Sequence, residues 1–228
     1  MMMMPILETI FSKLENVKVI EATIPYSEYV PIDLSISNLD LSKMDMDNTN
    51  DFETYSANLL QNNKAKVAFG GYNEVRNLYK SSLLFNADEK EERNIHLGMD
   101  LWIKAGTPVL AALDGIVHSF DFNAGKGNYG PTIILEHNIE NLVFYTLYGH
   151  LSMESIAEIE IGTDFQKGQQ IAVLGKPTEN GGYSPHLHFQ IIKKIEGYFG
   201  DYPGVCSKNK LDYYLENCPD PNLLLKIS

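Results

Sequence analysis

The sequence predicts a mainly β protein of antiparallel sheets, preceded by a smaller α+β extension at the N-terminus. Two observations support this fold class. From residue 93 onward, short apolar runs alternate with turn residues such as Asp114-Gly115 and Lys167-Gly168, and short strands at this spacing are typical of antiparallel sheets. Residues 1–90 lack this alternation and contain one segment with helical periodicity.

Residues 1–90 are expected to form the N-terminal extension. Within it, residues 15–22 (ENVKVIEA) predict a short strand, and residues 34–50, rich in Asp, Asn and Ser, predict a loop. The charged residues 88–93 are expected to form a surface connection to the main domain.

One helix is expected in this extension, at residues 51–61. Asn50, followed three residues later by Glu53, resembles a capping box, which is typical of a helix N-terminus. The apolar side chains that share one face of this helix are Phe52, Tyr55 and Leu59.

The main domain is expected at residues 91–194, followed by a tail at residues 195–228 that packs on it. Residues 211–216 of the tail predict one or two helical turns, ended by Pro219 and Pro221. The predicted strands of the main domain lie at residues 100–103, 108–113, 115–122, 132–136, 142–148, 170–174 and 187–192.

The composition excludes several classes of partner. Thirty acidic and eighteen basic residues give a net charge of −12, which repels nucleic acids and anionic membrane surfaces. No apolar run approaches the roughly 18 residues of a membrane helix. No basic start followed by an apolar core marks a secretory signal, so we expect a cytoplasmic protein, with export left open. Cys206 and Cys218 are then expected to be reduced thiols, although an exported chain could pair them.

Five polar residues form the candidate site. His96 and Asp100 stand in HLGMD, His186 and His188 in PHLHF, and His150 in LYGHLS. A catalytic zinc site typically uses three histidine, carboxylate or thiolate ligands and keeps one position for water. Residues two apart on a strand point to the same side, so His186 and His188 can share one pocket.

Each of these motifs alone is weak evidence, because a histidine next to apolar residues is usually part of the core. Their joint occurrence is the stronger signal. His118 and His137 lack such neighbours, and we interpret them as ordinary strand or strand-end residues. Tyr129 and Tyr183 stand beside glycines and are interpreted as turn-flanking residues, with substrate contact as the minority interpretation.

Residues 96–190 closely resemble the lysostaphin-like, or LytM-type, zinc endopeptidases. The matching segments are HLGMDLWIKAGTPVLAALDGIVHSF, NYGPTIILEH, YTLYGHLS, KGQQIAVLGK and SPHLHFQI. The resemblance implies an antiparallel domain with a duplicated half-barrel motif. It also implies one Zn²⁺ per chain, bound by His96, Asp100 and His188, with His150 and His186 as catalytic histidines.

The chain departs from this family at two positions beside the histidine pair. Members often have a glycine and a glutamate where Ser184 and Gln190 stand here. We expect neither residue to touch a metal ligand, so both departures should affect substrate fit more than chemistry.

The predicted function is that of a zinc-dependent endopeptidase acting on a peptide or a peptidoglycan-derived substrate. His186 is expected to act as the general base and His150 to donate a hydrogen bond to the oxyanion. Related zymogens fill the open zinc position from an upstream segment, and residues 35–50 offer Asn and Asp side chains for this. Packing of that segment elsewhere is an equally good alternative.

Two other functions were considered. One is a binding module that retains zinc without turnover. The other is a biotinyl or lipoyl carrier, which the segments VLAALDGIVHSF and KGQQIAVLGK resemble, although no Met-Lys-Met hairpin is present. The scissile bond and the oligomeric state stay open.

Overall fold

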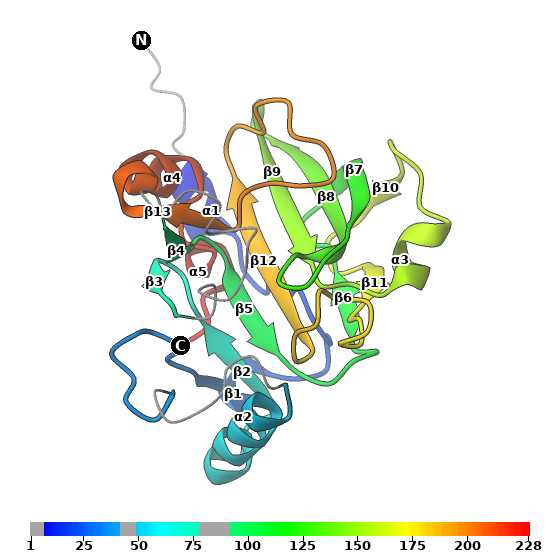
Figure 1. Ribbon diagram of the computed structural model, residues 1–228. Helices are drawn as coiled ribbons and strands as arrows, with labels where there is room; N and C mark the ends of the chain where they lie inside the picture. Colours follow the sequence, from blue (N-terminus) through cyan, green and yellow to red (C-terminus); the bar gives the residue numbers. More distant parts are fainter. Residues whose placement is uncertain (1–6, 42–48, 78–91) are drawn as a thin grey trace.

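The computed structural model describes residues 7–41, 49–77 and 92–228 (Figure 1). Its largest sheet is eight-stranded in the described residues, with the order β1-β2-β5-β12-β9-β8-β7-β10. These strands are β1 (Tyr29–Pro31), β2 (Val67–Gly70), β5 (Met99–Trp102), β12 (His186–Ile192), β9 (Leu142–Gly149), β8 (Gly130–Ile139), β7 (Gly115–Asn123) and β10 (Asp164–Phe165).

Two smaller sheets accompany it in the described part of the chain. One pairs β11 (Gln170–Val173) with β6 (Pro108–Leu110). The other has the order β13-β4-β3, with β13 (Val205–Ser207), β4 (Arg93–His96) and β3 (Glu74–Val75). Between the described strands, every ladder is antiparallel except the one between β1 and β2. The predicted mainly β fold class is confirmed.

Each strand predicted for the main domain overlaps an observed strand. Residues 108–113 predicted a longer strand than the structure has, because β6 ends at Leu110. The short strands β1, β2, β3, β4, β10 and β13 were not predicted. Four residues or fewer carry little periodic signal, and a distant partner decides whether such a segment pairs.

Successive side chains of β12 point to opposite faces of the sheet, one toward the core and the other toward the candidate site. Leu187, Phe189 and Ile191 belong to the largest apolar cluster of the protein. His186, His188 and Gln190 alternate with them and therefore point to the opposite face of the sheet. The apolar residues fix the register of β12, and this register determines where the histidines lie.

The described part of the N-terminal extension differs from the prediction in two respects. Its residues form two α-helices where one was predicted: α1 (Leu7–Lys13), which buries Leu7, Ile10 and Phe11, precedes α2 (Thr49–Asn63). Residues 15–22 form no strand, only an isolated bridge between Ile20 and Val109. Part of the polar segment 34–50 and most of the charged segment 88–93 lie outside the described residues, as does the side chain of the predicted cap, Asn50.

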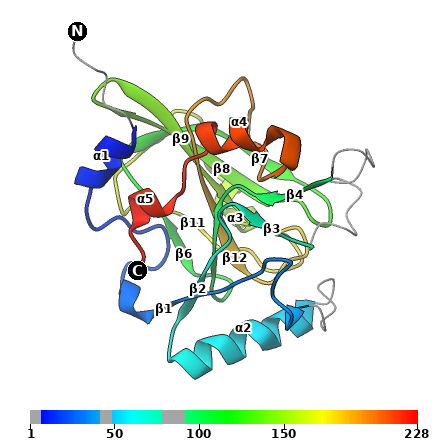
Figure 2. The ribbon, with the colours of Figure 1, turned by 90° about the vertical axis from the view of Figure 1, so that its left-hand side faces the viewer.

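Strand β2 of the extension pairs antiparallel with β5 and places Gly70 opposite Asp100. Helix α2 lies alongside β1 and β2 in both views (Figures 1 and 2). Its Phe52 ring packs 5.9 Å from the Trp102 ring of β5, centroid to centroid. The extension thus continues the sheet that carries Asp100. The domain boundaries at residues 90 and 194 stay predictions.

The remaining helical elements of the described residues are η1 (Tyr26–Glu28), α3 (Met153–Ala157), η3 (Lys208–Lys210), α4 (Leu211–Asn217) and α5 (Asn222–Leu225). Helix α4 coincides with the turns predicted at residues 211–216. Leu224, Leu225 and Ile227 join the largest apolar cluster, where Phe11 of α1 also packs. Cys206 and Cys218 are free and buried. None of the helices in the described ranges has the length and apolar character needed to cross a membrane.

Candidate metal centre

Three strands bring His96, Asp100 and His188 together. His96 is the last residue of β4, Asp100 lies in β5, and His188 of β12 is the direct register partner of Asp100. The turn between β4 and β5 contains Gly98. A Cβ atom at this position would lie 2.5 Å from Cε1 of His188. Only glycine therefore lets this turn approach the His188 ring without displacing it.

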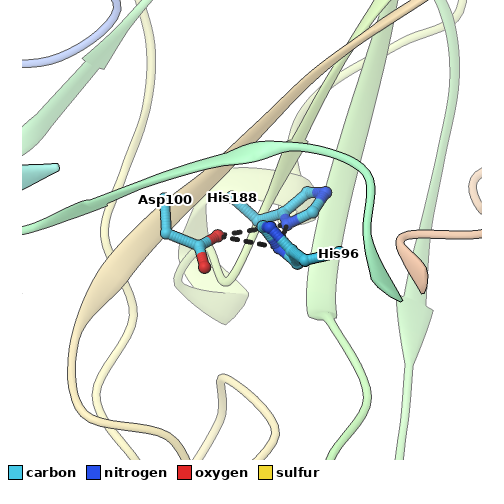
Figure 3. Close-up of side chains that lie close together, drawn as sticks. All are labelled: His96, Asp100 and His188. Carbon is cyan, nitrogen blue, oxygen red and sulfur yellow. Dashed lines mark hydrogen bonds and ion pairs between the residues drawn. The ribbon is translucent and has the colours of Figure 1, made fainter. Parts of the chain in front are cut away.

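The ligand atoms of these three residues face one another (Figure 3). Nε2 of His96 lies 2.9 Å from Nδ1 of His188, and Oδ1 of Asp100 lies 3.2 Å from that Nδ1 and 3.3 Å from that Nε2. All three side chains are buried. Zinc ligands at about 2.0–2.1 Å in a tetrahedral arrangement lie roughly 3.3 Å apart, so the spacing fits a metal ion.

Hydrogen bonds to the other ring nitrogens indicate which atoms carry lone pairs. His96 Nδ1 lies 2.9 Å from the carbonyl oxygen of Gly71, to which it donates. His188 Nε2 lies 2.9 Å from Oε1 of Gln190 and donates to it. The Gln190 amide is itself oriented, because its Nε2 donates to the carbonyl of Pro203 at 3.1 Å. Neutral rings in these tautomers turn two lone pairs and one carboxylate oxygen toward each other, an arrangement that a cation stabilises.

Charge and burial agree with this assignment. Burial lowers the pKa of His96 to about 4, and the Arg76 charge contributes, so His96 is neutral near pH 7 and can act as a ligand. Burial alone would raise the pKa of Asp100. The neighbouring His96 and Arg76 more than offset it and hold that pKa well below its usual value. The cluster therefore has the neutral imidazole of His96 and the carboxylate of Asp100 available for a metal ion, next to the His188 ring.

His186 and His150 lie beside this cluster. Nε2 of His186 is 4.0 Å from Oδ1 of Asp100, and the ring centroids of His150 and His186 are 4.2 Å apart. Each Nδ1 faces a carbonyl oxygen, that of Ser184 at 2.7 Å for His186 and that of Asn180 at 2.8 Å for His150. Each Nε2 is therefore the proton acceptor of a neutral ring. Burial is the main cause that lowers the pKa of both histidines.

Residues 94–198 match the model of peptidase family M23. This match covers a little less than half of the chain, and the name M23 domain below refers to this matched region. All five predicted site residues lie within the matched range, and the structure brings all five together. Their individual roles stay predictions.

Relatives of this M23 domain include two curated bacterial proteins. An uncharacterized metalloprotease of Haemophilus influenzae is 35% identical over 95 residues, which are 42% of this chain and 18% of that protein. The peptidoglycan DD-endopeptidase ShyC of Vibrio cholerae is 32% identical over 97 residues, 42% of this chain and 20% of that protein. The match thus spans about a fifth of the length of each of these two relatives.

Two solved structures are also similar. The catalytic domain of the antimicrobial peptidase lysostaphin from Staphylococcus simulans is 27% identical, with 53% of this chain and 80% of that domain covered and a TM-score of 0.36. LytU is 25% identical, with 55% and 76% covered and a TM-score of 0.36.

Aromatic residues surround the histidines of the M23 domain. The Trp102 ring stacks on His186 with centroids 5.5 Å apart and an interplanar angle of 21°. Tyr183 presents its ring to His150 at 5.1 Å, and the Tyr129 ring lies 5.0 Å from His188. The interpretation of both tyrosines as turn-flanking residues missed their contacts with the site. The contact of Trp102 with the site was not predicted either, because a tryptophan in an apolar strand is usually a core residue.

The expectation that Gln190 touches none of the predicted metal ligands was wrong, because its side chain accepts a hydrogen bond from His188, one of the three predicted ligands. Its position two residues after His188 on the same strand could have indicated this contact. The other two histidines lie outside the cluster. His137 is bound to the carbonyl of Asp114 and to Thr146, and His118 contacts Ser119 and Tyr145.

His150 has an unusual backbone conformation for a residue with a side chain. Its φ angle is 64°, in the left-handed region, which costs a non-glycine residue free energy. Its N–H donates to the carbonyl of Tyr129 and its own carbonyl accepts from the N–H of Gly175, both at 2.9 Å. These two bonds hold the conformation that aims the ring at His186. Strain of this kind occurs preferentially at functional sites.

Proposed function

We propose that the M23 domain of this chain is a zinc-dependent endopeptidase. The observation that carries the proposal is the convergence on one buried point of five side chains, four from strands β4, β5 and β12 and that of His150 directly after β9. His96 Nε2, Asp100 Oδ1 and His188 Nδ1 would hold the metal ion, and His186 and His150 lie next to them. Two histidines, one carboxylate and neighbouring imidazoles fit a catalytic zinc site.

Zinc bound there supplies Lewis-acid activation of water and of the scissile carbonyl. His186 is the general base in this proposal. Its Nδ1–H is bound to the Ser184 carbonyl, which leaves Nε2 to accept the proton of the attacking water. The imidazolium that results can then donate that proton to the leaving amine.

The tautomer of His150 sets a condition on its proposed role. Its Nδ1–H is bound to the Asn180 carbonyl, so Nε2 of the neutral ring accepts and does not donate. His150 can therefore stabilise an oxyanion by hydrogen bonding only when Nε2 carries a proton. The two rings, 4.2 Å apart, are close enough for one protonated ring to disfavour protonation of the other.

The proposed substrate is a peptide bond in peptidoglycan or in a peptide derived from it. The relative in Vibrio cholerae is named a peptidoglycan DD-endopeptidase, and this supports the class of substrate. The purified zinc-loaded chain should cleave members of a panel of muropeptides and glycine-rich peptides, with the products identified by mass spectrometry. The control is His186→Ala, which should bind zinc and cleave none of them.

A chain that holds one zinc ion and cleaves nothing in this panel contradicts the proposal. That result would favour the zinc-retaining binding module.

A further inference from the structure

Residues 70–76 precede the matched M23 region and yet contact two of the three proposed metal ligands. The carbonyl of Gly71 accepts from His96 Nδ1 at 2.9 Å. The N–H of Asn73 donates to the His96 carbonyl, also at 2.9 Å, and Glu74 is the register partner of His96 in the β3–β4 ladder. This part of the N-terminal extension therefore lies directly against the strand that carries His96.

Arg76 makes the contact with Asp100. Its side chain is 3% exposed, and its Nη1 donates to Oδ2 of Asp100 at 2.6 Å. Its Nε donates to Oε2 of Glu74 at 2.6 Å, and the other oxygen of Glu74 accepts from the N–H of Leu34 at 2.9 Å. The guanidinium also lies 5.9 Å from the Trp102 ring centroid. Arg76 is thus held from three sides.

The fold makes room for this guanidinium at Gly71. A Cβ atom on residue 71 would lie 1.9 Å from Nη2 of Arg76, and the φ angle there is +100°. Glycine at this position therefore permits the positive φ angle and leaves space for the Arg76 guanidinium.

Arg76 and Glu74 together are close to neutral, so their effect on a cation at the cluster is mainly geometric. The planar fork of Arg76 holds Oδ2 of Asp100 and leaves Oδ1 facing the two histidines. We propose that Arg76, braced by Glu74, is a positioning residue that keeps Asp100 a one-oxygen metal ligand. The proposal rests on the proposed metal site and extends that site beyond residues 94–198.

The test is metal binding by the full-length chain with Arg76→Gln and Glu74→Gln combined, a pair of changes that removes one positive and one negative charge and so keeps the net charge beside Asp100 unchanged. Zn²⁺ affinity is measured by competition with a chromophoric chelator, and we expect it to fall by roughly 10–100-fold, as for other partners of metal ligands. The visible spectrum of the Co²⁺-loaded variant should lose intensity, because a freed carboxylate can add its second oxygen and raise the coordination number.

Arg76→Lys is the second variant, and it keeps the charge in the same place. Lysine has no planar fork, so we expect its Zn²⁺ affinity to fall as well. The matched control is Arg93→Gln, on the strand of His96. Arg93 donates to the Val205 carbonyl at 3.0 and 3.1 Å, and its loss should leave Zn²⁺ affinity and the Co²⁺ spectrum unchanged.

Wild-type Zn²⁺ affinity and a wild-type Co²⁺ spectrum in the folded double variant would overturn the proposal. Wild-type values for Arg76→Lys would do the same, because they would show that charge alone is sufficient. Peptide hydrolysis is measured separately. Failure of the endopeptidase proposal therefore gives a different result from failure of the positioning role.

Discussion

His186 and His188 differ by two positions on one strand, and their ring nitrogens have different partners. Nδ1 of His188 faces the carboxylate of Asp100 at 3.2 Å, whereas Nδ1 of His186 is bound to the carbonyl of Ser184. The backbone register fixes this difference, since β12 places His188 opposite Asp100 and His186 opposite Trp102.

Separate alanine variants should therefore differ in metal content. His188→Ala removes a proposed ligand, and zinc should be lost or bound far more weakly. His186→Ala and His150→Ala leave all three ligands in place, so zinc should stay near one per chain while turnover falls by roughly 10²–10⁴. Metal analysis beside activity checks this. Zinc lost from His186→Ala and retained by His188→Ala would mean that the roles are reversed.

The left-handed backbone of His150 predicts an unusual order of stability. His150→Gly should be more stable than His150→Ala by on the order of 1 kcal/mol, because only glycine adopts this φ without strain. Urea unfolding of both variants in the presence of a chelator measures the difference. His186, which lies in a strand, is the control: there the alanine variant should be the more stable one. Equal stability of the two His150 variants would show that the conformation carries no strain.

Among the elements, strands β7, β8 and β9 are joined by a buried polar network around His137. Its Nδ1 donates to the carbonyl of Asp114 in the turn before β7, and its Nε2 accepts from Thr146 of β9 at 2.7 Å. The Tyr148 hydroxyl continues the network, since it lies 3.1 Å from Oγ1 of Thr146 and accepts from the N–H of Ala112. Both ring nitrogens of the neutral His137 are thus hydrogen-bonded.

This network predicts a loss of stability in acid. Burial lowers the pKa of His137 to about 4 in the folded chain, against about 6.5 when unfolded. Below pH 6.5 the unfolded chain binds a proton that the folded chain does not, so stability is full above pH 6.5 and falls as the pH drops toward 4. The loss from this residue is on the order of 3 kcal/mol.

His137→Gln should remove that part of the pH dependence. Urea unfolding at pH 7 and pH 4.5, with a chelator present, should show a smaller loss in this variant than in the wild-type chain. His118→Gln on the neighbouring strand β7 is the matched control and should behave like wild type. An unchanged pH dependence in His137→Gln would assign the acid sensitivity to other groups.

At the scale of the whole molecule, the N-terminal extension is part of the sheet that carries the site. Strand β2 pairs with β5, Phe52 of α2 packs on Trp102, and Arg76 binds Asp100. Of the segment expected to cover the metal position, residues 42–48 lie outside the described residues. Its described part forms local bonds, such as that from Asn38 to the Asp33 carbonyl at 2.7 Å.

A chain beginning at Glu92 therefore tests the extension as a whole. We expect a lower melting temperature and a lower zinc content, because β5 loses its partner strand and Asp100 loses Arg76. If the extension instead covers the metal position, the shortened chain should have a higher activity than the full-length chain. Wild-type zinc content together with faster turnover in the shortened chain would mean that the extension covers the site and does not build it.

The sequence by itself predicted seven strands of the main domain and named five candidate site residues, whose roles stay predictions. Both depend on local patterns: apolar runs between turn residues for the strands, and the period of two that places His186 and His188 on one face. The resemblance to lysostaphin-like peptidases then assigned His96, Asp100 and His150 to the same site. Features of this kind can be predicted from the sequence because residues close together along the chain form the pattern.

Only the tertiary structure decided what surrounds the site. Arg76 and Asp100 are 24 positions apart, and Gly71 and His96 are 25 apart, so no local period links them. The β1, β2 and β3 segments that bring them together are four residues or shorter. Their conformation comes from pairing with distant strands, because so short a segment has too little intrinsic preference to form a strand alone.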